Sequence, residues 1–223
     1  MQNPSPPDRA AAEGQSHSSS AGSATVASAP ALGYADLVRI ALFAALIAVL
    51  GLVPKFDLPF TAGVPITAQT LGVMLAGLIL GPRNAALSVL LLIFVVALGA
   101  PVLSGGRGGL GVFVGPTVGF LLGWIAGAWA CGTIYRLLLQ RLPAQRFIAA
   151  FTACVTGGIV VIYACGIPGL MLVTGMPLAK AATAVLVFVP GDLIKSALAA
   201  WIATRLHAVR WRAASSAHTP PSV

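Results

Sequence analysis

Charged residues are scarce in this chain of 223 amino acids. Only 8% of the residues are Asp, Glu, Lys or Arg, whereas 58% are hydrophobic. An ordinary soluble domain carries about 25% charged residues. So few charges cannot cover a water-facing surface, and the composition therefore excludes a water-soluble globular protein and predicts a membrane protein.

Acidic residues are especially rare, with five Asp and Glu against 13 Lys and Arg, for a net charge of +8. A positive balance can indicate nucleic-acid binding, but here the Arg residues stand at the edges of apolar blocks. The chain has no basic run with interleaved aromatic residues. We therefore expect no nucleic-acid partner, because charges at these positions are typical of the flanks of membrane helices.

Common catalytic and metal-binding motifs are also missing. Cys131, Cys154 and Cys165 lie inside apolar blocks and form no CxxC or CxxH pair, which favours small buried hydrophobes. The sequence contains no GxxxxGK[ST], no HExxH and no GxSxG. We expect no cofactor, no metal and no enzymatic reaction, and a chain that binds or conducts a solute.

Long apolar blocks are what the sequence has in abundance. A spanning helix needs about 20 mostly apolar residues, and the blocks lie at about 35–53, 66–81, 84–100, 116–139, 147–167 and 178–206. They predict an all-α membrane protein, a bundle of six transmembrane helices over residues 34–208. Residues 1–33, rich in Ser, Ala, Gly and Pro, predict a disordered cytoplasmic tail, and residues 209–223 a short basic one.

The last block is interrupted by Pro190 and Gly191. Proline removes a backbone donor and disfavours the preceding helical turn. We therefore predict a short helix or re-entrant segment at 178–189. The final helix would then begin near Gly191, with Asp192 as its N-cap.

The positions of Lys and Arg predict the orientation. Six spans place both ends of the chain on one side, and the cations on that side are Arg39, Arg83, Arg136, Arg141, Arg146, Arg205, Arg210 and Arg212. The other side has Lys55, Arg107 and Lys180. Eight cations against three predict a multi-pass protein of the cell membrane with both termini cytoplasmic. The loops 54–65, 101–115 and 168–177 would face outward.

Two helices carry stripes of small residues, which let helix backbones approach closely in a membrane. The first stripe consists of Ala41, Ala44, Ala45 and Ala48. It is explained equally well by packing inside the bundle and by docking of another membrane protein. The second stripe, Gly115, Gly119, Gly123 and Gly127, favours packing inside the bundle.

Asp192 and Lys195 place two charges inside the last apolar block, three residues apart and on one helix face. Charges inside a bilayer are costly, so they should face the interior and have partners. One interpretation is a self-neutralising pair that fixes the helix. The other is a polar ligand site at the helix start, where the amides and the dipole favour an anion or a polar group.

The loop 104–111 contains five glycines around Arg107. Glycine lets backbone amides approach a ligand closely, and Arg107 presents a forked cation suited to a carboxylate. A solvated Arg in a flexible exterior loop is the alternative.

Five segments of this chain, 40–60, 64–91, 99–124, 161–170 and 176–200, are similar to BioY proteins. These proteins are the biotin-specific substrate-binding (S) components of energy-coupling-factor (ECF) vitamin transporters. The resemblance covers about 35–206, and its most specific parts are the Gly-rich loop leading into Gly-Pro-Thr and the Pro-Gly-Asp-x-x-Lys element. It implies a six-helix S component that binds biotin from outside with high affinity. Its partners would be a transmembrane coupling protein and two ATPase subunits.

The resemblance also implies site residues. The substrate-binding set is Gln69, Gly106, Arg107, Gly108, Tyr163, Asp192 and Lys195, and the coupling face is Ala41, Ala44, Ala45 and Ala48. Biotin has a ureido ring, an apolar thioether ring and a carboxylate. Asp192 can accept hydrogen bonds from the ureido N–H groups, Lys195 can donate to the ureido carbonyl and Arg107 can bind the carboxylate. The roles of Lys195 and Arg107 could also be exchanged.

The chain departs from the family pattern at Leu92, Leu103 and Gly169, where an aromatic, a Phe and a Trp are usual. Loss of the Trp would loosen the lid over the pocket or shift contacts with the biotin ring. The competing hypotheses are an S component for thiamine or riboflavin, and a membrane packing or assembly protein without a ligand. Riboflavin would need aromatic stacking surfaces, and the outward loops offer Phe56 and Phe60.

Overall fold

The computed structural model describes residues 33–53 and 67–216, and the described residues are almost entirely helical. The helices are α1 (Tyr34–Leu50), α2 (Gln69–Leu80), α3 (Pro82–Ala97), the 3₁₀ helix η1 (Leu110–Val114), α4 (Val118–Arg141), α5 (Arg146–Val155), the π-helical segment η2 (Thr156–Val161), α6 (Ile162–Thr174), α7 (Leu178–Leu186) and α8 (Val189–Ser216). The predictions for residues 1–32, for the loop 54–65 with Lys55, Phe56 and Phe60, and for 217–223 concern residues outside the described ranges.

These elements form six helical segments in the predicted order, because α5, η2 and α6 are continuous and α7 and α8 form a pair bent by 50°. By length and composition, Val118–Arg141 and Arg146–Thr174 are each able to cross a membrane, and the bent pair makes a third span. Gln69–Leu80 and Pro82–Ala97 are shorter apolar helices.

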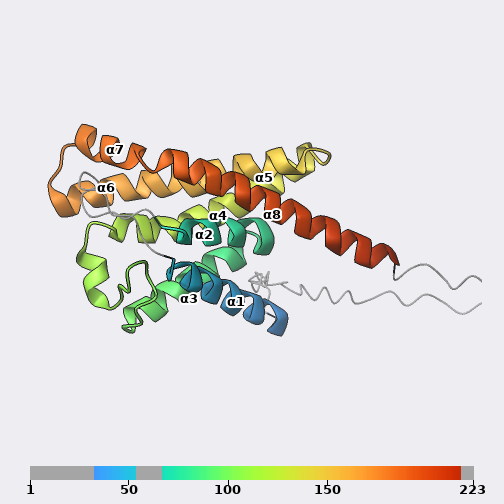
Figure 1. Ribbon diagram of the computed structural model, residues 1–223, viewed down its shortest axis with the longest axis horizontal. Helices are drawn as coiled ribbons and strands as arrows, with labels where there is room; N and C mark the ends of the chain where they lie inside the picture. Colours follow the sequence, from blue (N-terminus) through green and yellow to red (C-terminus); the bar gives the residue numbers. More distant parts are fainter. Residues whose placement is uncertain (1–32, 54–66, 217–223) are drawn as a thin grey trace, which may run out of the picture. The chain divides into compact units, whose positions relative to one another are not determined.

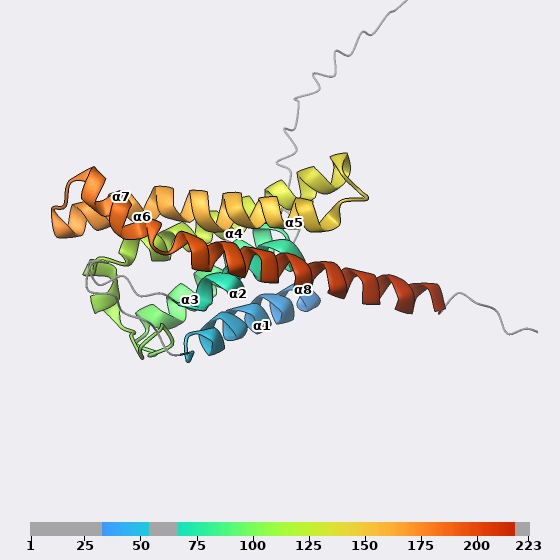
Figure 2. The ribbon, with the colours of Figure 1, turned by 45° about the horizontal axis from the view of Figure 1, so that its top comes forward.

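Helix α4 is the centre of the bundle, since it packs against α2, α3, α5 and α6. Helix α1 lies against α2 and α3, and α8 lies against α2 and α5 (Figures 1 and 2). Most of the buried side chains are aliphatic, and they fill the space between the helices.

The glycine stripe of α4 is used for packing inside the bundle, as the spacing predicts. A Cβ atom on Gly119, Gly123 or Gly127 would collide with the α5–η2–α6 helix. Gly115 has only ordinary contacts and stands outside this seam. The close approach of α4 and α6 therefore depends on the last three glycines of the stripe.

The predicted end of the fifth helix at 167 and the loop 168–177 are wrong. The helix continues through Pro168 to Thr174, and Gly175, with a φ of 69°, caps it by donating its N–H to the Met171 carbonyl. Pro168 removes one backbone hydrogen bond, and the tight packing of α6 on α4 around Gly119 offsets that loss.

The predicted N-cap role of Asp192 is also wrong. Helix α8 begins at Val189, so Asp192 lies inside its first turn and its N–H donates to the Phe188 carbonyl at 2.9 Å. Pro190 is accommodated because a helix needs no backbone donor in its first turn. The short separate helix that the sequence predicts before this point is present as α7.

Candidate functional site

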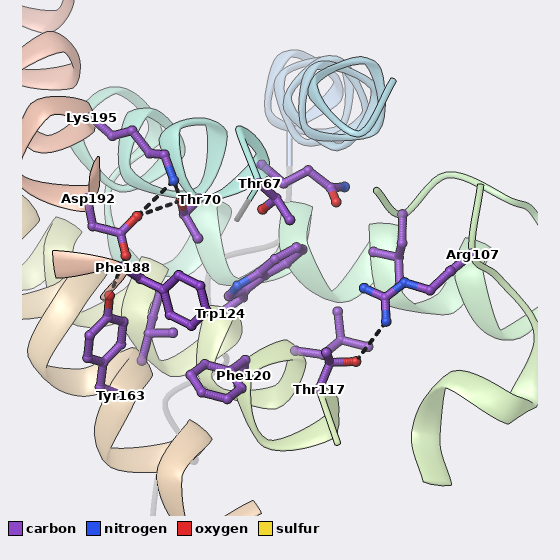
Figure 3. Close-up of a pocket in the computed structure, with 14 residues that line it drawn as sticks. Thr67, Thr70, Arg107, Thr117, Phe120, Trp124, Tyr163, Phe188, Asp192 and Lys195 are labelled. Atoms are coloured by element: carbon purple, nitrogen blue, oxygen red, sulfur yellow. Dashed lines mark hydrogen bonds and ion pairs between the residues drawn. The ribbon is translucent and has the colours of Figure 1, made fainter. Parts of the chain in front are cut away.

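A pocket opens at the end of the bundle where α2, α4 and α8 begin and α1 ends. Fourteen side chains line it, drawn from α2, α4, α6 and α8, from the loop before α4, and from the residues just before α2 and α8 (Figure 3). They are Thr67, Gln69, Thr70, Leu103, Arg107, Thr117, Phe120, Leu121, Trp124, Ile162, Tyr163, Phe188, Asp192 and Lys195. The lining includes five of the seven predicted binding residues. Four of these five carry a formal charge or a phenol, and they lie at the two ends of the pocket (Figure 3).

One end of the pocket is a group of four hydrogen-bonded side chains, which we call the Asp192 cluster: Asp192, Lys195, Thr70 and Tyr163. Lys195 Nζ lies 2.8 Å from Asp192 Oδ1, with side chains 18% and 6% exposed. Lys195 also donates to Thr70 Oγ1 at 3.2 Å, and Thr70 donates to Asp192 Oδ1 at 3.4 Å. The predicted pairing of Asp192 with Lys195 is confirmed, and it gives each charge the partner that burial requires.

Tyr163 completes this cluster from α6. Its hydroxyl donates to Asp192 Oδ2 at 2.6 Å, and its ring packs edge-to-face with Phe120, with 6.3 Å between centroids. Tyr163 is the second residue after the π-helical segment, in which Gly157 lies against the backbone of Cys131 and Gly158 against Met74. Such segments are frequent at functional sites because they shift the register of the side chains that follow.

Arg107 stands at the other end of the pocket (Figure 3). Its loop is a narrow turn in which the backbones of Leu103 and Arg107 exchange hydrogen bonds at 3.0 and 3.2 Å. The guanidinium donates through Nε to the Ser104 carbonyl and through Nη1 to Thr117 Oγ1. These bonds hold the planar fork in a defined orientation, which a solvated exterior Arg would not have.

The glycines beside Arg107 shape this turn. Gly106 has a φ of 70°, which favours glycine, and a Cβ atom on Gly108 would collide with the Ala100 carbonyl. Neither residue lines the pocket. The backbone geometry of the turn explains why glycine stands at positions 106 and 108, and a direct role of either residue in ligand binding stays a prediction.

Gln69 lies in the first turn of α2 and is 1% exposed. Its Nε2 donates to the Ile47 and Val102 carbonyls, both at 3.2 Å. Its Oε1 accepts the backbone N–H and the hydroxyl of Ser104, both at 3.0 Å. A side-chain amide has two donor hydrogens and two acceptor lone pairs, so these four bonds occupy all of them.

Three aromatic side chains, Phe120, Trp124 and Phe188, form the middle of the pocket between its polar ends (Figure 3). These three residues are not in the predicted binding set, because the aromatic side chains expected near a ligand were those of the outward loops. Phe120 and Trp124 stand four residues apart on α4, directly after the Gly-Pro-Thr element. That spacing places both on one helix face and was the available signal.

The alanine stripe of α1 is split between two faces. Ala44 is buried in the core and Ala48 packs against it. Ala41 and Ala45 are exposed, beside exposed Leu42 and Val49. Internal packing therefore accounts for one small-residue pair, and the other pair is available to a partner in the membrane.

The three departures from the family pattern have different surroundings. Leu92 is buried in the core, Leu103 lines the pocket, and Gly169 lies inside α6 against the backbone of Gly119. A Cβ atom at Gly169 would collide with Gly119. Gly169 therefore belongs to the α4–α6 seam in this chain, and the expected effect of the missing Trp on the lid or on the ring contacts stays a prediction.

Comparison with known proteins identifies the family. The family model described as "BioY family" matches residues 20–212. The chain is 50% identical to "Biotin transporter BioY" of Rhizobium etli, over 74% of this chain and 89% of the relative. It is also 50% identical to "Biotin transporter BioY" of Rhodobacter capsulatus, over 72% of this chain and 86% of the relative.

A solved structure agrees with these relatives. The crystal structure of the S-component for biotin from an ECF-type ABC transporter superposes with a TM-score of 0.73 at 31% identity, over 78% of this chain and 90% of the other. The relatives are named as transporters and not as enzymes. On the sequence matches, the fold and the pocket, this chain is a six-helix membrane protein that belongs to the BioY family.

Proposed function

We propose that this chain is the membrane-embedded, high-affinity biotin-binding component of an ECF-type transporter and serves biotin uptake. The observation that carries the proposal is the division of the pocket into a polar end around Asp192, an aromatic middle and a cationic end at Arg107. Biotin has the same order of groups, with a ureido ring, an apolar thioether ring with its alkyl chain, and a carboxylate. The names of the relatives support the same substrate.

The Asp192 cluster suits the ureido group, because one negative and one positive charge pair there and the group itself is neutral. A carboxylate has about four acceptor positions, and Asp192 already accepts from Lys195, Thr70 and Tyr163. One position therefore remains for a ureido N–H without breaking a bond. Asp192 receives one ureido N–H in this arrangement, the Thr70 hydroxyl is the nearby acceptor for the second, and Lys195 donates to the ureido carbonyl.

Arg107 suits the carboxylate. Among the described residues that line the pocket, the charged side chains are Asp192, Arg107 and Lys195. Lys195 is paired with Asp192 at one end, and the Arg107 guanidinium is oriented by Ser104 and Thr117 at the other. A guanidinium binds a carboxylate through parallel hydrogen bonds, so this division assigns the carboxylate to Arg107 and the ureido group to the Asp192 cluster.

The aromatic middle accounts for the rest of the molecule. Phe120, Trp124 and Phe188 are mostly buried, and Leu121 and Ile162 extend the apolar lining. Burial of the thioether ring and the alkyl chain against these side chains supplies the apolar part of the binding free energy.

The proposal includes partners and an orientation. The chain would work with a transmembrane coupling protein and two ATPase subunits that use ATP on its behalf, and would itself hold no cofactor. The exposed pair Ala41 and Ala45 on α1 is the surface we assign to the coupling protein. Both termini would be cytoplasmic by the distribution of Lys and Arg, so the pocket would open outward.

Calorimetry of the purified full chain in detergent tests the proposal. We expect saturable binding of biotin at one site and no heat of binding with thiamine or riboflavin. Folded protein that binds thiamine or riboflavin in place of biotin would replace the substrate. Folded protein that binds none of the three would leave the membrane packing role as the explanation.

A further inference from the structure

The buried amide of Gln69 joins three parts of the chain that are distant in sequence. We infer that Gln69 is a positioning residue, which holds the Arg107 turn and the end of α1 together at the start of α2. This inference rests on the proposed function, because Arg107 is the residue that it positions for the ligand. It differs from the role that the family resemblance implies for Gln69, which is direct contact with the substrate.

The first step is that Gln69 has no hydrogen-bonding capacity left for a ligand. Its two donor hydrogens go to the carbonyls of Ile47 and Val102, and its oxygen accepts twice from Ser104. A ligand group could bond to this amide only by displacing one of those partners, and a buried partner left unsatisfied is costly. Gln69 lines the pocket as part of its wall.

The second step is the short path from Gln69 to Arg107. Ser104 binds Gln69 through its N–H and its hydroxyl, and the carbonyl of the same residue accepts Arg107 Nε at 3.2 Å. The backbone bonds between Leu103 and Arg107 close the turn around Ser104. Anchoring Ser104 therefore fixes both the backbone and the guanidinium of Arg107.

The third step is the contact with α1. The Ile47 carbonyl belongs to the last turn of α1, and Gln69 Nε2 bonds to it and to Val102 in the loop. A Cβ atom on Gly51, which ends α1, would collide with the Val102 carbonyl and with Gln69 Nε2. Glycine at 51 thus permits the close approach that lets one amide reach both the helix and the loop.

Hydrogen exchange of the ligand-free protein tests the anchoring without any ligand. We expect Gln69→Leu to increase deuterium uptake at the Ser104 amide, which donates to Gln69, and in the segment 102–107 and the end of α1. The control is Leu78→Ala, a buried position at the other end of α2, which should lower overall stability without selective uptake there. Equal uptake in the two variants would overturn the anchoring.

A double-mutant cycle tests the effect on the site. We expect Gln69→Leu to weaken biotin binding about tenfold in the otherwise wild-type chain but less than about twofold when Arg107→Met is also present, because residues that act through each other are not additive. A purely structural role or a direct ligand contact predicts the same loss in both backgrounds. Ser104→Ala, which removes one of the two bonds to Gln69, should show a smaller loss with the same dependence on Arg107.

The outcomes separate this inference from the proposed function. If the wild-type chain binds no biotin, the proposed function fails, and hydrogen exchange alone decides whether Gln69 anchors the turn. If biotin binds and the losses are additive, the proposed function stands and the positioning role is overturned.

Discussion

Two buried polar groups line the same pocket and differ in how many hydrogen bonds they can still make. At the Gln69 junction (Gln69, Ile47, Val102 and Ser104) every donor and acceptor of the amide is used within the protein. In the Asp192 cluster the charges are paired, yet the carboxylate keeps an acceptor position. The comparison shows that burial of a polar side chain does not by itself indicate ligand binding. The number of hydrogen bonds that the side chain already makes within the protein distinguishes a structural residue from one that can still bind a ligand.

The largest effect is expected from Asp192→Asn, which keeps the shape and removes the charge. Lys195 then stays in the pocket with a weakened partner, and breaking a buried pair typically costs about 3–5 kcal/mol. We expect biotin affinity to fall by about two to three orders of magnitude, measured by calorimetry on protein shown to be folded by circular dichroism. A loss of less than about threefold would mean that the Asp192 cluster only holds α8 in place.

Tyr163→Phe should have a smaller effect. It removes the hydroxyl that donates to Asp192 Oδ2 and keeps the ring that packs on Phe120. A hydrogen bond to a charged group contributes about 1.5–3 kcal/mol, and water or the ligand can replace part of it, so we expect about a tenfold loss of affinity. Undiminished binding would show that Asp192 needs no support from α6.

Ser196→Ala should have the smallest effect and serves as the matched control. Ser196 is fully buried on α8, one turn from Asp192, and donates to the Asp192 backbone carbonyl at 2.8 Å. It makes no contact with the Asp192 carboxylate among the described hydrogen bonds. We expect biotin affinity within about twofold of wild type, and a loss as large as that of Tyr163→Phe would extend the binding cluster along the helix.

The sequence was sufficient to predict the helices and the paired charges for direct physical reasons. Apolar runs of spanning length predict helices, and two charges three residues apart in such a run must meet. The continuation of the helix through Pro168 could not be predicted from the sequence, because it depends on packing against Gly119, about fifty residues away in the chain.

The role of Gln69 could not be predicted from the sequence either. Its partners Ile47, Val102 and Ser104 lie 22 to 35 residues away, and no local pattern states that an amide will be saturated. The aromatic middle of the pocket was missed for a different reason, since Phe120 and Trp124 stand in a uniformly apolar helix where binding residues and core residues look alike.

We propose different tasks for the two cations described in the pocket, Arg107 and Lys195, and one set of titrations distinguishes the two tasks. Biotin and its uncharged amide would be titrated against the wild type, Arg107→Met and Lys195→Met. We expect the wild type and Lys195→Met to favour biotin over the amide, by about ten- to a hundredfold for a charge-assisted contact, and Arg107→Met to lose this preference. If Lys195→Met loses the preference and Arg107→Met keeps it, the ligand lies in the opposite direction and the proposed assignment of the carboxylate to Arg107 is wrong.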